Sequence, residues 1–355
     1  GWEWRYLWQF CQSDAQSVLK EADANTVLSV AASSDGKWVA AGQRLGGNLT
    51  LFNLQTKGKV RVPAGEGAVW VAFSPREPLL AFSTIVSSQT TQSEATTGAT
   101  APATYRVVLW DVNIRQVARD MTLRGSCFGL SFSDDGKTLA IATRISAGAA
   151  ETSLWSVTDG TKVAAWAAGA PPAGFFLASY AASRNLEVAA VVTERNKLSV
   201  VNLKTGQVGW SAVATDQLVS ALAFSLDGKV LASGAGYADD TIRLWEVATG
   251  REIGRLEGHR GWIGQLAFLA DGKHLVSSSA DQTLRLWDLD TRTSIRTFRG
   301  HKTEVWRFAL LPDQRTVVSG CKDGSVYLWD LNAERGHFAA GQLDRGGGGW
   351  GFQEG

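Results

Sequence analysis

Two stretches decide the fold: residues 258–298 are GHRGWIGQLAFLADGKHLVSSSADQTLRLWDLDTRTSIRTF, and residues 300–331 are GHKTEVWRFALLPDQRTVVSGCKDGSVYLWDL. They are two copies of one pattern, because equivalent residues lie 42 positions apart throughout. The matched residues are Gly258-His259 with Gly300-His301, Asp281 with Asp323, and Trp287-Asp288 with Trp329-Asp330. A repeat of this length indicates a small sheet that cannot bury both of its faces alone, so further copies are expected along the chain.

Weaker copies precede these two. Each has short strands of alternating apolar and polar residues, often with an Asp-Gly turn such as 35–36 between the first two strands. The third strand of each copy ends near a marker residue, and the seven markers are Phe52, Trp110, Trp155, Val201, Trp245, Trp287 and Trp329. The wide first interval contains a Ser/Thr/Ala-rich tract at 87–104, which has no strand periodicity and predicts a loop.

The Gly-His and Trp-Asp ends of the pattern resemble the WD40 repeat, and the resemblance covers residues 15–331. It implies an all-β fold, a seven-bladed WD40-type β-propeller. Strand Ala15–Glu21 would then complete the last blade and close the ring. The resemblance also implies a buried network in blades six and seven, formed by His259, Ser277, Asp281 and Trp287 and by His301, Ser319, Asp323 and Trp329. In blade five, Thr215 stands at the position of the histidine.

The two ends of the chain are predicted to lie outside the propeller. Residues 1–14 place Trp4, Leu7 and Trp8 at helical spacing, which indicates a short amphipathic helix. Residues 332–355 contain four consecutive glycines and predict a disordered tail. The opening GWEWRYLW is similar to the segment before WD40 propellers in large bacterial signalling proteins that also carry kinase regions, so we expect this chain to be one module of such a protein.

Composition limits the kinds of partner and the cellular compartment that we expect. Basic and acidic side chains number 35 and 34, giving a net charge of +1, which disfavours a nucleic-acid or membrane surface. A weak basic patch at residues 292, 296, 299, 302 and 307 keeps a nucleic-acid module as an alternative. Three cysteines are too few for a disulfide framework, so we expect a reducing, cytoplasmic compartment. No apolar run is long enough for a transmembrane helix.

No catalytic or metal-binding spacing stands out. Two of the four histidines already have a structural role, and the others, His274 and His337, lie in a turn and in the tail. Gly136-Lys137-Thr138 lacks the glycine spacing and the following helix of a phosphate loop. We therefore expect no catalytic residue, no metal and no cofactor. A propeller enzyme with a site in the axial channel remains the alternative, and it would need polar groups that converge there.

The expected activity is non-catalytic binding of a protein or peptide. In a propeller, the loops that lead into each blade and those that join its second and third strands share one face, and the insertions at 87–104 and 144–152 both fall there. Loops on a rigid scaffold commonly carry binding residues. The candidates on this face are Arg124, Phe175, Tyr237, Arg260, Trp262, Lys302 and Glu304. For Trp262 an interface anchor and a packing residue between blades are both open.

Overall fold

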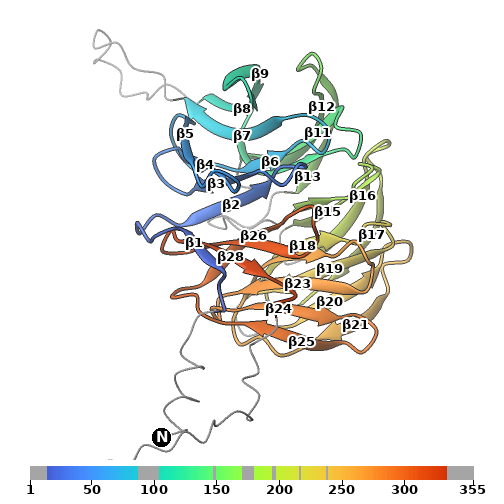
Figure 1. Ribbon diagram of the computed structural model, residues 1–355. Helices are drawn as coiled ribbons and strands as arrows, with labels where there is room; N and C mark the ends of the chain where they lie inside the picture. The colour runs from blue at the N-terminus through green and yellow to red at the C-terminus, as the bar shows by residue number, and fades with distance from the viewer. Residues whose placement is uncertain are drawn as a thin grey trace, which may run out of the picture.

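The computed structural model describes residues 14–86, 104–146, 149–169, 180–193, 197–215, 217–236 and 239–333. Within these ranges the regular structure consists of 28 β-strands, and no helix occurs. The strands form seven separate sheets of four antiparallel strands each. The described part of the chain is therefore an all-β, seven-bladed propeller (Figure 1).

The first four blades follow the chain in order. Blade one contains β2 (Val27–Ala32), β3 (Trp38–Gln43), β4 (Asn48–Asn53) and β5 (Lys59–Pro63). Blade two contains β6 (Val71–Phe73), β7 (Leu79–Val86), β8 (Thr104–Asp111) and β9 (Gln116–Leu123). Blade three contains β10 (Ser126–Phe132), β11 (Thr138–Ser146), β12 (Ala149–Ser156) and β13 (Lys162–Gly169). Blade four contains β14 (Tyr180–Ala182), β15 (Val188–Thr193), β16 (Lys197–Asn202) and β17 (Val208–Val213).

The last three blades repeat this order until the final one. Blade five contains β18 (Val219–Phe224), β19 (Val230–Ala235), β20 (Ile242–Glu246) and β21 (Glu252–Leu256). Blade six contains β22 (Ile263–Phe268), β23 (His274–Ser279), β24 (Leu284–Asp288) and β25 (Thr293–Phe298). Blade seven contains β26 (Val305–Leu310), β27 (Thr316–Cys321), β28 (Val326–Asp330) and, from the other end of the chain, β1 (Ser17–Lys20).

Strand β1 is the outer strand of blade seven, although it comes first in the sequence. It runs antiparallel to β28, with Ser17 opposite Leu328 and Val18 opposite Tyr327. In Figure 1 the blue start of the chain accordingly lies beside the red last blade. The described N-terminal segment and the C-terminal blade are thus joined by a strand pair.

Local sequence explains the hairpin turns. At the turn between β2 and β3, Ser33 Oγ donates to Asp35 Oδ1 at 2.6 Å, and the same carboxylate oxygen accepts the Lys37 N–H at 3.0 Å. Gly36 has a φ of +69°, a left-handed conformation that glycine adopts without steric cost. The predicted Asp-Gly signal therefore fixes the turn by side-chain capping and by backbone freedom.

The core lies between the blades rather than within any one of them. Leu49 and Leu51 of blade one pack with Leu80 and Phe82 of blade two, and all four are almost fully buried. At the junction of the last and first blades, Val318 and Val326 pack with Val27, Val39 and Phe52. Each sheet buries its two apolar faces against two neighbours, so the interfaces form a closed circle.

Two sequence expectations change here, and two others lie almost wholly outside the described residues. The insertion at 144–152 is a hairpin extension, because β11 and β12 continue through it on both sides of residues 147–148. Thr104 belongs to β8 rather than to the loop, and residues 87–103 lie outside the described residues. The expected helix (1–14) and tail (332–355) lie outside them too, apart from residues 14, 332 and 333.

Candidate functional site

A chain of buried hydrogen bonds, which we call the relay, links the loop before blade six to its third strand. The Trp287 indole N–H donates to Ser277 Oγ at 2.8 Å, and Ser277 Oγ lies 2.6 Å from His259 Nε2. On the other side of the ring, His259 Nδ1 lies 2.7 Å from Asp281 Oδ2. Because the indole can only donate and the carboxylate accepts, the neutral imidazole carries its proton on Nδ1 and accepts the serine hydroxyl on Nε2.

The charges of this network are set by burial and hydrogen bonding. Burial lowers the pKa of His259, more than the neighbouring Asp281 carboxylate raises it, so the ring is neutral at pH 7. For Asp281 burial alone would raise the pKa, but hydrogen bonds from His259, Thr283 and the Arg260 N–H outweigh it and hold that pKa well below its usual range. In this network an ionised, largely buried carboxylate therefore accepts hydrogen bonds from neutral donors.

Blade seven keeps the relay but changes its last partner. Trp329 Nε1 donates to Ser319 Oγ at 2.7 Å, and that oxygen lies 2.8 Å from His301 Nε2. His301 Nδ1, however, lies 3.1 Å from the Gln282 carbonyl and does not bond Asp323. Asp323 instead accepts the Ser325 N–H at 3.0 Å. Blade seven therefore departs from the network that the resemblance implies, because the Gln282 carbonyl of the preceding blade accepts the hydrogen bond from the imidazole N–H in place of Asp323.

The relay weakens toward the N-terminal blades. In blade five, Thr215 Oγ1 donates to Asp239 Oδ2 at 2.6 Å, and Trp245 Nε1 donates to Ser233 Oγ at 2.8 Å. In blade two, the buried Trp110 Nε1 finds no acceptor among the described residues. These side chains are therefore structural, and the binding site has to be sought elsewhere.

The loops that lead into each blade and those that join second and third strands contact one another through backbone hydrogen bonds. Examples are Val69 N–H to Gln43 O at 3.0 Å, Ala280 N–H to Trp262 O at 2.9 Å and Lys322 N–H to Glu304 O at 3.0 Å. These two sets of loops thus form one surface, which we call the loop face. Arg124, Arg260, Lys302 and Glu304 belong to it.

The candidates on the loop face differ in exposure. Arg124, Arg260 and Lys302 are exposed, whereas Glu304 is half-buried and is paired with Lys322 at 2.9 Å. Trp262 is only 7% exposed, and its ring packs edge-on against Trp306 with ring centres 5.6 Å apart. An exposed interface anchor at Trp262 is therefore wrong: the indole packs between neighbouring blades. Phe175 and Tyr237 lie outside the described residues.

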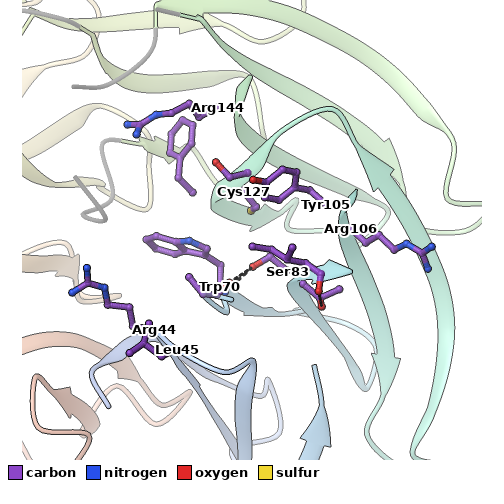
Figure 2. Close-up of a pocket in the computed structure, with 13 residues that line it drawn as sticks. Arg44, Leu45, Trp70, Ser83, Tyr105, Arg106, Cys127 and Arg144 are labelled. Carbon is purple, nitrogen blue, oxygen red and sulfur yellow. Dashed lines mark hydrogen bonds between the residues drawn. The ribbon is translucent and has the colours of Figure 1, made fainter. Parts of the chain in front are cut away.

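A cavity of about 370 Å³ opens where blades one, two and three meet. We call it the three-blade pocket, and Figure 2 shows its side chains. Its apolar surface comes from Leu45, Ile85, Trp70, Tyr105 and Phe128. Trp70 is held in place by its backbone N–H, which donates to Ser83 Oγ at 2.9 Å. Since these residues lie in the loops and strand ends that build the loop face, the pocket belongs to that face.

Among the described residues, three arginines and no carboxylate line the three-blade pocket. Arg44 and Arg144 are half-buried, and in Figure 2 the Trp70 indole lies between them, while Arg106 points away. Arg106 is paired with Asp120 at 2.8 Å. Burial raises the pKa of the Cys127 thiol in the pocket to about 12, so the sulfur remains a neutral thiol and is no nucleophile at neutral pH. The pocket therefore combines aromatic surface with positive charge.

Sequence reasoning missed this pocket, although one signal was present. Arg44 and Arg144 occupy equivalent positions in blades one and three, each two residues after a matched pair, since Gly42 is opposite Ser29 and Ala142 is opposite Gly129. Aligning blades one and three would have paired the two arginines. Nothing in the sequence shows that the intervening blade places Trp70 between them.

The described residues contain neither a metal-binding cluster nor a membrane-spanning helix. No group of three or more His, Cys, Asp or Glu side chains gathers there in a way that could hold a metal ion. In the same ranges, the structure contains no helix of the length and apolarity that crossing a bilayer requires.

Comparison with known proteins gives matches to repeats of one kind. The family model described as "WD domain, G-beta repeat" matches residues 250–288 and 292–330, which correspond to blades six and seven. The model "Anaphase-promoting complex subunit 4 WD40 domain" matches residues 179–262. The matched region therefore begins in blade four and ends with blade seven.

Three relatives are similar over part of the chain. A protein of Thermomonospora curvata named "Probable serine/threonine-protein kinase PkwA" is 45% identical over 51 residues, 14% of this chain and 7% of its own. A WD repeat-containing protein of Synechocystis is 28% identical over 156 residues, 44% of this chain and 42% of its own. A WD repeat-containing protein of Schizosaccharomyces pombe is 39% identical over 57 residues, which are 16% of this chain and 12% of its own. The chain thus spans less than half the length of each relative.

The different partners of the two buried histidines predict different coupling energies. In a double-mutant cycle, His259→Ala with Asp281→Ala should show a coupling of about 1–3 kcal/mol in the free energy of unfolding, because the pair shares a buried charge-assisted hydrogen bond. The equivalent cycle with His301→Ala and Asp323→Ala should show less than about 0.5 kcal/mol. Urea unfolding measures both, and equal couplings would contradict the assigned geometry.

The buried neutral histidines also predict a pH dependence. Burial lowers the pKa of His301 from 6.5 to about 3 in the folded protein. Between these values the unfolded chain binds a proton that the folded protein does not. Stability is therefore complete above pH 6.5 and falls toward pH 3, by at most about 1.4 kcal/mol per pH unit for each such histidine.

Calorimetric melting at pH 7.5 and at pH 5 measures this loss. His301→Gln should reduce the difference between the two melting temperatures, whereas His274→Gln, in a half-exposed turn, should leave it unchanged. An unaltered difference in His301→Gln would show that other groups cause the acid sensitivity.

Proposed function

Since this chain is a seven-bladed β-propeller that carries WD40 repeats, we propose that it is a non-catalytic protein-interaction module that binds a peptide segment of its partner on the loop face. The observation that carries the proposal is the three-blade pocket, an apolar cavity whose described lining contains arginines and no carboxylate. Aromatic and arginine side chains commonly dominate binding energy at protein interfaces.

The chemistry of the pocket defines the segment that fits. Leu45, Trp70 and Phe128 offer apolar contact to one large side chain, and the volume of about 370 Å³ admits such a group. Arg44 and Arg144 favour a carboxylate next to it, since a guanidinium binds a carboxylate through two parallel hydrogen bonds. The proposed ligand is therefore a peptide in which a bulky apolar residue is flanked by Asp or Glu. The exposed Arg124, Arg260 and Lys302 would add peripheral contacts on the same face.

The proposed setting is a larger cytoplasmic signalling protein of a bacterium. The short similarity to a protein named as a kinase supports a signalling context. Cys127 and Cys321 are free thiols, which suits a reducing compartment. A propeller enzyme or a nucleic-acid module finds no specific support among the described residues.

The peptide site predicts a pair of contrasting variants. Leu45 is 63% exposed at the pocket, and Ile114 is 65% exposed in the β8–β9 turn, which lies on the opposite face of the propeller. Peptides selected from a random display library against the full chain should carry an apolar residue next to acidic ones. Leu45→Asp should weaken their binding by about tenfold or more, because hot-spot contacts are worth about 2 kcal/mol.

Ile114→Asp is the matched control and should bind as the unaltered chain does. Fluorescence anisotropy with a labelled peptide gives the affinities, and melting temperatures confirm that both variants fold. Loss of binding in Ile114→Asp alone would place the site on the other face, and selection of basic peptides would refute the charge argument.

We also propose that strand β1 closes the ring. Besides its pairing with β28, Lys20 Nζ donates to Gly324 O at 2.9 Å, and the Asp23 and Ala24 N–H groups donate to Asp323 O at 2.9 and 2.8 Å. Without β1, the backbone of β28 would be an unpaired edge, which invites association with other chains.

Two truncations separate the contribution of β1 from that of the residues before it. Deleting residues 1–21 should lower the melting temperature by several degrees and promote aggregation, since the β1–β28 strand pair and the apolar contacts of Ala15 and Leu19 are lost together. Deleting residues 1–13 keeps β1 and should leave the melting temperature close to that of the full chain. Light scattering during thermal melting reports both effects, and equal melting of the two truncations would exclude a closing role.

A further inference from the structure

A second cavity, of about 520 Å³, occupies the axis of the propeller. It is lined by residues from the first strands of all seven blades and reaches the turns after those strands, where Asp134 and Arg184 lie. At its other end lies a layer of residues from five blades, each at the first position after the bulge in the first strand of its blade. The members defined by this register are Ser29, Gly129, Ala221, Gln265 and Arg307.

Arg307 is the one charged residue of this layer, and it is only 3% exposed. Its Nε donates to the Leu28 carbonyl at 3.0 Å, and its Nη1 donates to the Gly264 carbonyl. These two carbonyls belong to the extra residues of the bulges in blades one and six, which the strand ladders leave free to accept. The guanidinium carbon also lies 5.4 Å from the centre of the Trp70 ring.

One nitrogen of Arg307 is left over. Nη2 is buried and has no hydrogen-bond partner among the described residues. A role as a tie between blades accounts for Nε and Nη1, but it gives Nη2 nothing to bind. A buried donor without an acceptor costs about 1–3 kcal/mol, and more when the group is charged. The position therefore calls for an acceptor that the described chain does not supply.

Among the described residues, no carboxylate pairs with the Arg307 guanidinium. The other charged residues that line the axial cavity, Asp134 and Arg184, form a pair with each other at 3.5 Å. Residues 170–179, which precede β14, contain no Asp or Glu in the sequence. Burial lowers the pKa of Arg307 to about 10, which still leaves the guanidinium protonated at neutral pH. A buried cation of this kind favours an anionic partner in its cavity.

We propose that the axial cavity, which Arg307 lines, binds a small oxyanion, a carboxylate or phosphate group, and that the guanidinium turns its unpartnered Nη2 toward the bound anion. The volume lies within the range of small-molecule sites, about 300–1,000 Å³. The anion enters past Asp134 and Arg184, at the face opposite the loop face. Trp70 and Phe128 line both the axial cavity and the three-blade pocket, so these two aromatic side chains form the partition between the two sites.

Thermal unfolding of the full chain in increasing inorganic phosphate or sodium acetate tests the proposal, with ionic strength held constant by sodium chloride. A ligand that binds only the folded state raises the melting temperature in a saturable way. We expect this rise with at least one of the two anions, and isothermal titration calorimetry should give one site per chain. A response to phosphate alone assigns a phosphoryl ligand, and a response to acetate assigns a carboxylate.

Arg307→Met keeps the length of the side chain and removes its charge, and it should weaken anion binding by about tenfold or more. If that variant does not fold, Arg307→Gln, which places the residue of blade six at this position, provides the same comparison. Arg315→Met is the control, because Arg315 is exposed and paired with Asp330 at 2.6 Å in an outer turn. Absence of a saturable shift with both anions, or equal affinity in the Arg307 variants, overturns the site.

Discussion

A four-stranded blade has two apolar faces and can cover neither by itself, and this constraint governs the whole molecule. Each described interface buries residues of two neighbouring blades, such as Leu49 of blade one with Phe82 of blade two. In the last interface Val318 of blade seven packs on Val27 of blade one, and these side chains are as fully buried as those of the other interfaces. Burial of apolar surface is the dominant favourable term in folding, so the closed ring is the arrangement in which no blade has an exposed apolar face.

The blades differ in whether the indole N–H of their tryptophan has a hydrogen-bond acceptor. Blades five, six and seven satisfy their buried tryptophan N–H groups with serine hydroxyls, at 2.7–2.8 Å. In blade two the Trp110 N–H has no partner within the described ranges. In blade three Trp155 Nε1 donates to Ser153 Oγ at 2.9 Å. Because a buried polar group without a partner lowers stability, blade two is the least well satisfied of these blades. The three-blade pocket lies beside that blade, where blades one, two and three meet.

The two cavities share a physical origin in the bulges of the first strands. A bulge leaves one residue outside the strand ladder and turns its neighbours toward the axis. In blades one and six the free carbonyls hold the Arg307 guanidinium, and Phe128, the bulged residue of blade three, lines both cavities. One irregularity of the sheet thus positions both the cation of the axial cavity and part of the aromatic wall of the three-blade pocket.

The sequence by itself determined the all-β class and the seven repeats, because strand periodicity, Asp-Gly turns and the Trp spacing are local signals. Its resemblance to the WD40 repeat implied the residues of the relay in blade six. Tertiary structure decided the rest. Trp262 changed from a candidate anchor to a packing residue, and His301 bonded the Gln282 carbonyl instead of Asp323, since both outcomes depend on what a neighbouring blade supplies. The three-blade pocket forms where the consecutive blades one, two and three pack together, and the Arg307 contact with the Leu28 carbonyl forms only where blade seven meets blade one. Neither arrangement can be predicted from a single repeat.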